Sequence, residues 1–332
     1  MNRVLIIGPD FHYFNESIAN AFRKLGWEAE VEAFATPIHP YSLWNKIRYK
    51  LSLNKLELKN ESRLRYDSYI RMRFDSYQPN LVFIMNGDNM ATSTVAYFHQ
   101  KAKVVFWLFD SITRMMHTLD NLREADAVYC YEQKDIPLLE REHIKASFLP
   151  QAVDSTLYYP IQGIEKKYDV VFAGEIWNSR KRQQLLEAVV LHFPNKKIRI
   201  VGRYKIPTKD FFGWLFRKHR DIFTNKNASA EELNMLYNQA RVVLNIHNEQ
   251  QQDGANPKVY EILATGAHEV CDANPYLETH FSQLIDLYHS KEEMIAQIET
   301  ALMKSPKPTN NTLVGNMFED RIQEILNDML IA

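Results

Sequence analysis

The residues best suited to bind an anion stand together near position 258. Asn256 and Pro257 precede Lys258, and Glu261 follows three residues later. Asn is a favoured helix N-cap and Pro suits the first helical turn, so the pattern predicts a helix that begins at Pro257. Backbone N–H groups at a helix N-terminus, with an ammonium beside them, bind phosphate. On one face of this helix, Lys258 would point to a phosphate and Glu261 would accept hydrogen bonds from hydroxyls such as those of a ribose.

More polar and basic residues follow other short apolar runs that read as strands. Because the carboxyl ends of parallel strands meet at one edge of a sheet, we expect these residues to converge with Lys258 in one crevice. Taken singly, the basic residues at 180–182 also suit a solvated helix start, and His247 also suits a satisfied loop or core histidine. The candidates are Gly174, Arg180, Lys181, Arg182, Arg203, Asn245 and His247.

Short apolar strands alternate with amphipathic helical stretches in both halves of the chain. This pattern is typical of parallel sheets covered on both faces. It predicts an α/β fold with two doubly wound, Rossmann-like domains that face a cleft. The expected strands are Val4–Ile7, Leu81–Met85, Val104–Phe109, Ala127–Tyr131, Val170–Ala173, Ile198–Val201, Val242–Ile246 and Glu269–Cys271.

Prolines mark the expected boundary between the two domains, at Pro150 and Pro160. We place the first domain at residues 1–155, with a basic helical insertion at about 40–78, and the second at 156–310. A last helix within 311–332 would pack at the domain junction. The insertion carries nine Lys or Arg against three acidic residues over 44–74. It suits either a helix pair packed on the first domain or a peripheral contact with an anionic membrane surface.

Composition limits the class of protein. The 332 residues carry a net charge of −1, which argues against nucleic-acid binding through overall charge. The two cysteines, Cys130 and Cys271, are far apart, so we expect neither a disulfide framework nor a cysteine zinc site. The start of the sequence has too short an apolar run for a signal peptide, and no run is long enough to span a bilayer. We therefore expect a cytoplasmic protein, at most peripheral to a membrane.

Three residues of the first half are candidates for proton transfer. Asp110 ends a probable central strand, and Asp10 and His12 follow the first strand. Asp110 is the leading candidate for a general base, and Asp10 and His12 are its rivals. The turn after the first strand lacks G-x-G-x-x-G, which disfavours a nicotinamide or flavin cofactor. No persuasive metal motif is present, so we expect neither a metal nor another cofactor.

The segment from Val242 to Ala267 resembles the donor-binding end of GT-B glycosyltransferases. It is particularly similar to the CgeB-like, spore-protein-like group, in which an asparagine, a basic residue and Phe/Tyr-Glu precede an alanine- and glycine-containing turn. The better-known retaining GT-B enzymes have Glu-x7-Glu here. Asp253 and Glu261 have that spacing, with Asp in place of the first Glu. The resemblance covers roughly residues 150–300.

This resemblance implies a metal-independent transfer of a sugar from a nucleoside-diphosphate sugar to a glycan or lipid-linked acceptor hydroxyl, as in polysaccharide biosynthesis. It implies that Glu261 binds the ribose, that Lys258 lies near the diphosphate, and that a residue among 180–182 also binds it. Two alternatives stay open: a nucleotide-sugar epimerase of the same architecture, and a non-catalytic nucleotide-sugar-binding protein. The implied donor-binding set is Gly174, Arg180, Lys181, Arg182, Arg203, Asn245, His247, Asp253, Asn256, Lys258 and Glu261.

Overall fold

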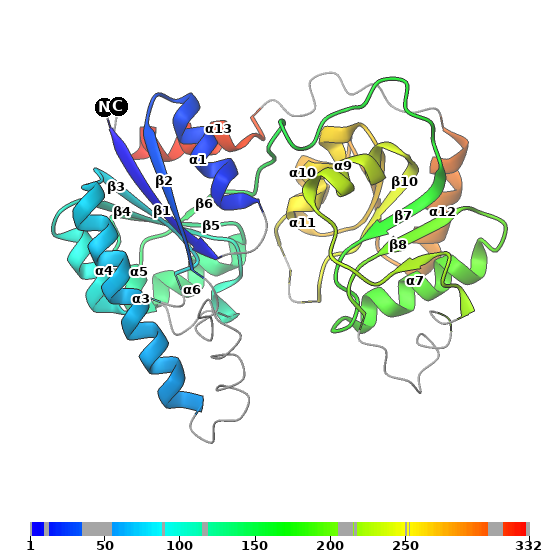
Figure 1. Ribbon diagram of the computed structural model, residues 1–332. Coiled ribbons are helices and arrows are strands. Elements are labelled where there is room, and N and C mark those ends of the chain that lie inside the picture. The colour runs from blue at the N-terminus through cyan, green and yellow to red at the C-terminus, as the bar shows by residue number, and fades with distance from the viewer. Residues whose placement is uncertain are drawn as a thin grey trace. The chain divides into compact units, whose positions relative to one another are not determined.

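Two parallel β-sheets form the framework of the chain in the computed structural model (Figure 1). Unit 1 contains Met1–Pro150 and Phe318–Ala332, and unit 2 contains Gln151–Met317. The chain thus leaves unit 1 five residues before the expected boundary, and the last helix forms part of unit 1. The structure describes residues 2–9, 13–34, 55–87, 90–114, 119–204, 215, 218–249, 251, 253–304 and 315–329, without the side chains of 55–60 and 62.

The sheet of unit 1 has six described strands in the order β2-β1-β3-β4-β5-β6, and all neighbours are parallel. The four strands expected in this half are confirmed within one or two residues at each end. β2 and β6 were not expected. The strands are β1 (Arg3–Pro9), β2 (Glu28–Phe34), β3 (Leu81–Met85), β4 (Lys103–Leu108), β5 (Ala127–Cys130) and β6 (Ser147–Phe148).

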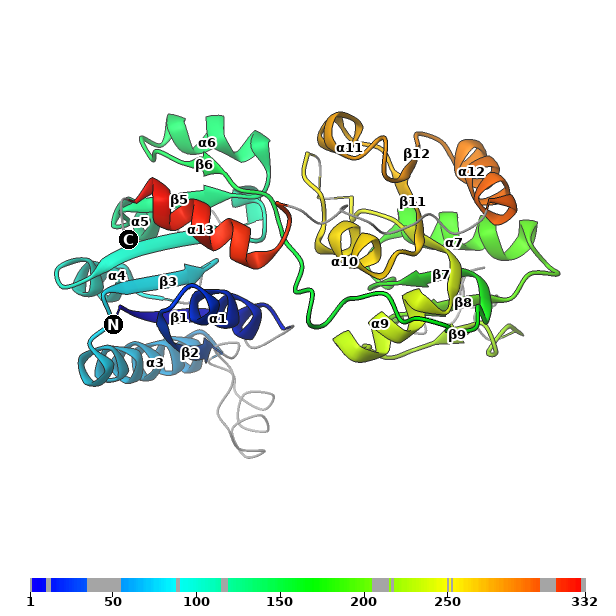
Figure 2. The same ribbon diagram turned by 90° about the horizontal axis from the view of Figure 1, so that it is seen from above.

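Helices cover both faces of this sheet. Phe22 and Phe318 of two helices pack against Phe83 and Trp107 on one face, where Figure 2 shows α1 and α13 side by side. Side chains such as Phe74 and Phe98 fill the core on the other face. The helices are α1 (Phe14–Lys24), α3 (Lys55–Tyr77), α4 (Thr92–His99), α5 (Leu119–Arg123), α6 (Ile136–Arg141) and α13 (Phe318–Asp328).

The described part of the basic segment is the long helix α3. Arg71 donates to Thr94 and Ser93, and Arg73 pairs with Glu30 and Glu32 of β2. These arginines are therefore bound to unit 1 itself, as expected for a helix packed on the first domain. The residues at 35–54 lie outside the described part, so membrane contact by that part of the segment stays a prediction. Within the described residues, no helix is long and apolar enough to cross a bilayer.

The sheet of unit 2 also has six described strands, in the order β12-β11-β10-β7-β8-β9. All neighbours are parallel. The chain starts at β7 in the middle, runs outward through β8 and β9, and then returns to build the other side from β10. The strand order therefore reverses between β7 and β10. The strands are β7 (Tyr168–Ala173), β8 (Ile198–Val201), β9 (Phe223–Thr224), β10 (Ala240–Asn245), β11 (His268–Asp272) and β12 (Asp286–Tyr288).

Helices also cover both faces of the second sheet (Figure 2). Side chains of α7 and α12 join one core cluster with β7, β8, β10 and β11, and α9 and α10 contact each other across the opposite face. The four strands expected in this half are confirmed within about two residues. The helices are α7 (Arg180–His192), α9 (Ala230–Asn238), α10 (Pro257–Thr265), α11 (Pro275–His280) and α12 (Lys291–Met303).

Candidate functional site

The candidate donor residues gather at the carboxyl edge of the sheet in unit 2. They lie in the loops and helix starts that follow β7, β8 and β10. In open α/β sheets, ligands bind outside the carboxyl ends of the strands where the strand order reverses. In unit 2 this position is between β7 and β10, and the candidate residues lie beside it.

Two glycines bring the loops after β7 and β8 into contact. A Cβ on Gly202 would lie 1.7 Å from the carbonyl oxygen of Gly174, so only glycine permits this approach. The carbonyl oxygen of Arg203 accepts hydrogen bonds from the backbone N–H groups of Ile176 (3.1 Å) and Trp177 (3.3 Å). The backbone of Arg203 therefore fixes the loop that leads into α7, while its side chain is exposed.

The N-terminus of α7 is bound to the loop that follows β10. Ser179 is the N-cap, and its hydroxyl accepts from the Arg182 N–H and donates to Glu249. The Lys181 N–H also donates to Glu249, at 2.9 Å. Burial opposes ionisation of Glu249, but these hydrogen bonds lower its pKa. A carboxylate thus already lies at the N-terminus of α7, where it interacts favourably with the helix dipole.

Arg182 has a structural role in this arrangement. Its side chain is buried, and its guanidinium donates to the carbonyl oxygens of Ile246 (2.8 and 3.0 Å) and Glu175 (2.8 Å). Burial lowers the pKa of Arg182. Because its donors bind the main chain of two loops, we assign Arg182 to holding these loops together and not to the ligand. Arg180, at the first position of α7, is exposed.

The N-terminus of α10 is built as expected from the sequence. The helix begins at Pro257, and the N-cap Asn256 accepts from the Val259 N–H at 3.3 Å. Asn245, at the end of β10, binds Asn256 through two amide contacts of 3.0 and 3.1 Å and also donates to Glu269 at 2.9 Å. Asn245 is buried, so we assign it to positioning the N-cap.

His247 holds the same N-cap from a second side. Its Nε2 accepts from the Asn256 N–H at 3.2 Å, and its Nδ1 lies 2.9 Å from Asp272. A backbone N–H can only donate, so Nε2 is unprotonated and Nδ1 carries the proton. Burial alone would raise the pKa of Asp272, but His247 and Lys181 hold it well below its ordinary range. Both ring nitrogens of His247 thus have hydrogen-bond partners within the protein, as in the interpretation of His247 as a loop or core histidine.

A continuous set of contacts joins the two helix N-termini. The Lys181 ammonium pairs with Asp272, Asp272 binds His247, and His247 binds the N-cap of α10. Lys181 remains accessible, because 37% of its side chain is exposed. Lys181 and the start of α10 are therefore joined by one set of contacts.

Lys258 and Glu261 lie on one face of α10 as expected. The ammonium nitrogen of Lys258 is 4.0 Å from a carboxylate oxygen of Glu261, and their side chains are 26% and 5% exposed. Lys258 is thus available to an anion. Glu261 would be reached by a ribose hydroxyl only through a small opening. Asp253 is buried in the loop before α10, where the Gly254 carbonyl accepts from the N-cap Asn274 of α11 at 2.9 Å.

One group among the described residues brings potential metal ligands together: His247, Cys271 and Asp272, with ligand atoms within 4.8 Å of one another. Both ring nitrogens of His247 already take part in hydrogen bonds. Burial raises the pKa of the Cys271 thiol well above its usual value, and thiolate is the form that binds metals. The donor set fits a hydrogen-bonded cluster better than a metal site.

In unit 1, Asp110 follows β4 at the carboxyl edge of the first sheet. Its carboxylate accepts from Arg114 at 2.7 Å and from the Asn86 amide at 3.4 Å. Asn86 also accepts from the Phe109 N–H at 2.7 Å and has a φ of +64°, so the end of β3 fixes the start of the Asp110 loop. Asp10 and His12 lie outside the described residues.

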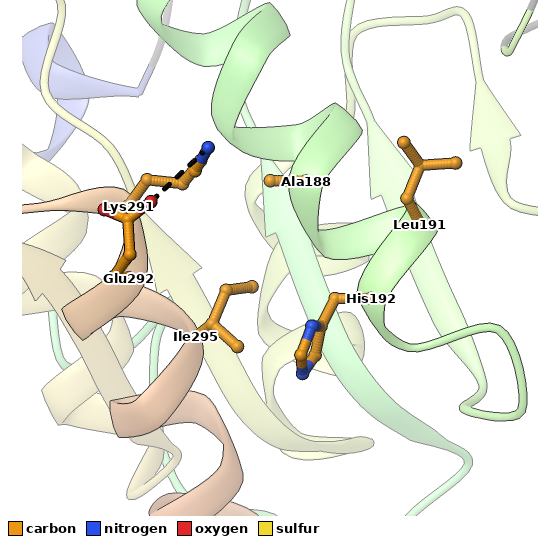
Figure 3. A pocket seen from close by; sticks show the side chains of 6 residues that line it. All are labelled: Ala188, Leu191, His192, Lys291, Glu292 and Ile295. Carbon is orange, nitrogen blue, oxygen red and sulfur yellow. Dashed lines mark ion pairs between the residues drawn. The ribbon is translucent and has the colours of Figure 1, made fainter.

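A surface pocket of about 520 Å³ lies between α7 and α12, away from these residues. Figure 3 shows Leu191 and Ile295 among its apolar walls, with the exposed Lys291–Glu292 ion pair at its margin. It contains none of the candidate residues. The carboxyl edge, with its converging polar groups, therefore remains the candidate site.

Sequence reasoning missed Asp272 and Glu249, which organise this edge. Asp272 ends β11 and directly follows the expected strand Glu269–Cys271, so its place at a strand end was a usable signal. Glu249 had no such signal, because only the folded loop brings it to α7.

Comparison with known proteins agrees with this fold. A family model described as glycosyl transferase-like matches residues 180–312, which include α7, α10 and every contact between them. The sequence matches none of the curated proteins with which it was compared.

Three solved structures show the similarity of the fold. Sucrose-phosphate synthase from Thermosynechococcus elongatus is 14% identical, with a TM-score of 0.64 over 100% of this chain and 96% of that one. An E. coli structure described as trehalose-6-phosphate bound with UDP-2-fluoro glucose is 12% identical, with a TM-score of 0.63 over 99% of both chains. UDP-GlcNAc 2-epimerase from Methanocaldococcus jannaschii is 13% identical, with a TM-score of 0.59 over 99% and 100%.

The two doubly wound parallel-sheet units define the GT-B fold, which confirms the expected fold class. The chain carries a glycosyl transferase-like region at residues 180–312. Together these findings support a GT-B glycosyltransferase in general terms.

Proposed function

We propose that the chain transfers a sugar from a nucleoside-diphosphate sugar to a hydroxyl of a glycan or lipid-linked acceptor. The observation that carries this proposal is the set of contacts that joins the N-termini of α7 and α10 at the strand-order reversal of unit 2. The N-terminus of α10 and the two accessible ammonium groups of Lys181 and Lys258 there can bind a diphosphate. The CgeB-like group remains the proposed subgroup, on the sequence pattern of residues 242–267.

The demanding step in this reaction is departure of the nucleoside diphosphate from the anomeric carbon. Negative charge grows on the leaving phosphate, so cations and amides already in place lower the barrier. Lys258 contributes one ammonium and Lys181 a second, while Glu261 binds the ribose. Asp253, in place of the first Glu of Glu-x7-Glu, is proposed to face the sugar from the loop before α10. With these groups the chain itself neutralises the diphosphate, and turnover is expected to persist in the presence of a chelator.

The acceptor hydroxyl must lose a proton during transfer. We assign this role to Asp110, with Asp10 and His12 as the other candidates of unit 1. Arg114 is bound to the Asp110 carboxylate at 2.7 Å, so an acceptor hydroxyl has to compete with that guanidinium. The peripheral membrane contact proposed for the basic segment 44–74 would serve a lipid-linked acceptor.

The test is turnover of a panel of nucleotide sugars with and without glycan acceptors. The proposal predicts release of a nucleoside diphosphate that depends on the acceptor. Lys258→Met should reduce donor affinity about tenfold or more, as expected for loss of a charge-assisted contact. Lys291→Met, which removes an exposed lysine at the α7–α12 pocket, should leave it unchanged.

Product analysis separates the alternatives. Inversion of a stereocentre of the sugar while it stays attached to the nucleotide, without any acceptor, would identify the protein as an epimerase. Tight binding of the nucleotide with no turnover across the whole panel would show a binding protein. Wild-type affinity in Lys258→Met would remove Lys258 from the site.

A further inference from the structure

Asp272 makes more contacts at the candidate site than a residue that merely ends a strand requires. It is the last residue of β11 and is 7% exposed. One carboxylate oxygen accepts from the backbone N–H of His247 at 2.8 Å and lies 2.9 Å from its Nδ1. The other oxygen accepts from the Lys181 ammonium. A single buried carboxylate thus binds one group from the first turn of α7 and one from the loop after β10.

The two carboxylate oxygens of Asp272 connect it to the two groups proposed to bind the anion, the Lys181 ammonium and the N-terminus of α10. Through Lys181 it sets the direction of an ammonium in the first turn of α7. Through His247 it holds the backbone N–H of Asn256, the N-cap of α10. The adjacent residues of α10 include Lys258. Asp272 therefore orients both the Lys181 ammonium and the N-terminus of α10.

The ion pair between Asp272 and Lys181 is in one respect unfavourable for binding a phosphate. A carboxylate beside Lys181 partly neutralises the charge that would attract a phosphate. The gain is orientation, because a long lysine side chain loses much rotamer freedom on binding, and a charge-assisted bond that holds it in advance reduces this loss. Because Lys181 keeps 37% of its side chain exposed, it can touch a ligand while bound to Asp272.

We propose that Asp272 is a positioning residue for the donor diphosphate, which it serves by fixing Lys181 directly and the N-terminus of α10 through His247. This inference rests on the proposed function, since it requires that a nucleoside diphosphate binds at this edge. Asp272 itself does not touch the ligand. It acts through groups that do.

The experiment measures affinity by calorimetry on the full chain. ADP, CDP, GDP, UDP and inorganic pyrophosphate are the probes, and the nucleotide that wild-type protein binds best is used for the variants. Asp272→Asn should weaken its binding about tenfold. Asp272→Glu keeps the charge but moves it by one methylene, so its affinity should lie between those of wild type and Asp272→Asn. Pyrophosphate should show the same order, because both groups that Asp272 positions face the phosphates.

The matched control is Glu269→Gln on the same strand. Glu269 is also buried, and burial raises the pKa of its carboxyl well above the ordinary value. The amide keeps an oxygen to accept from Asn245, as Glu269 does at 2.9 Å. Nucleotide affinity of Glu269→Gln should therefore equal that of wild type.

A double-mutant cycle shows whether Asp272 acts through Lys181. In Lys181→Met with Asp272→Asn, the combined loss of affinity should be at least about threefold smaller than the product of the single losses. If Asp272→Asn does not fold, the cycle is run with Asp272→Glu.

Three results would overturn the inference while leaving the proposed function intact. They are wild-type affinity in folded Asp272→Asn or Asp272→Glu, equal losses in both of these variants, and fully additive losses with Lys181→Met. If wild-type protein binds none of the nucleotides, the proposed function fails and the positioning role fails with it.

Discussion

Replacement of the N-cap Asn256 by Ala removes more than a helix cap. The side-chain oxygen accepts from the Val259 N–H, and the amide makes two contacts with the buried Asn245. Loss of an N-cap costs about 0.5–2 kcal/mol. An Asn245 oxygen left without its donor in the interior adds about 1–3 kcal/mol. Asn256→Ala should therefore lower the free energy of unfolding by about 1.5–5 kcal/mol.

Urea unfolding of the full chain, followed by circular dichroism, measures this loss. The midpoint of the transition in which unit 2 unfolds should shift to a lower urea concentration. The matched control is Ser290→Ala, since Ser290 caps α12 through a simple bond to the Glu293 N–H at 3.1 Å. The control should lose about 1 kcal/mol. Asn256→Asp keeps the cap oxygen but loses the donor to Asn245, so its stability should lie between wild type and Asn256→Ala. An Asn256→Ala loss no larger than that of Ser290→Ala would refute the account of this N-cap.

Three further predictions concern stability and proton transfer. The pKa of Asp272 is held below its unfolded value, so the unfolded chain takes up the proton first as the pH falls. Urea unfolding between pH 3 and 7 should therefore show that the free energy of unfolding decreases below about pH 4. This decrease should be less steep in Asp272→Asn. Gly202→Ala should cost about 3 kcal/mol by its clash with Gly174, whereas Gly163→Ala, in open space at a φ of +71°, should cost about 1 kcal/mol by the same assay. Asp110→Asn should lower turnover about 10²- to 10⁴-fold with unchanged donor affinity, and turnover near wild type would exclude Asp110 as the base.

The elements that were predicted correctly depend on local sequence. Near-continuous apolar runs such as Leu81–Met85 and Ile198–Val201 are buried on both faces of a parallel sheet, and the structure has strands at these residues. The α10 helix begins directly after Asn256, as its capping residues predicted, and it ends at Thr265 before Gly266, which has a φ of 72°. Both ends are set by residues next to each other in the chain.

Elements with a polar pattern were missed. β2 alternates Glu28, Glu30 and Glu32 with small or apolar residues, and it is an edge strand. Glu32 and Glu30 are stabilised by Arg73 of α3, at 2.5 and 2.8 Å, and Arg73 lies more than forty residues away in sequence. Nothing in the local pattern signals that partner.

The roles of residues within the site also depended on distant contacts. Arg182 resembled its neighbours as a cation, but its guanidinium binds the carbonyl of Ile246, which lies 64 residues away in the sequence. Lys181 and Asp272 are 91 residues apart. Residue type identified the chemistry available at this edge, whereas the division into ligand-facing and structural residues required the folded loops.

The central claim is that the diphosphate of a nucleotide sugar binds at the carboxyl edge of the second sheet. A crystal structure with the best-binding nucleoside diphosphate tests it directly. The account predicts phosphate oxygens at the N-terminus of α10, within about 3 Å of the Lys258 ammonium and close to Lys181. A nucleotide bound elsewhere, for example in the pocket between α7 and α12, with Lys258 and Lys181 facing only solvent, would contradict it.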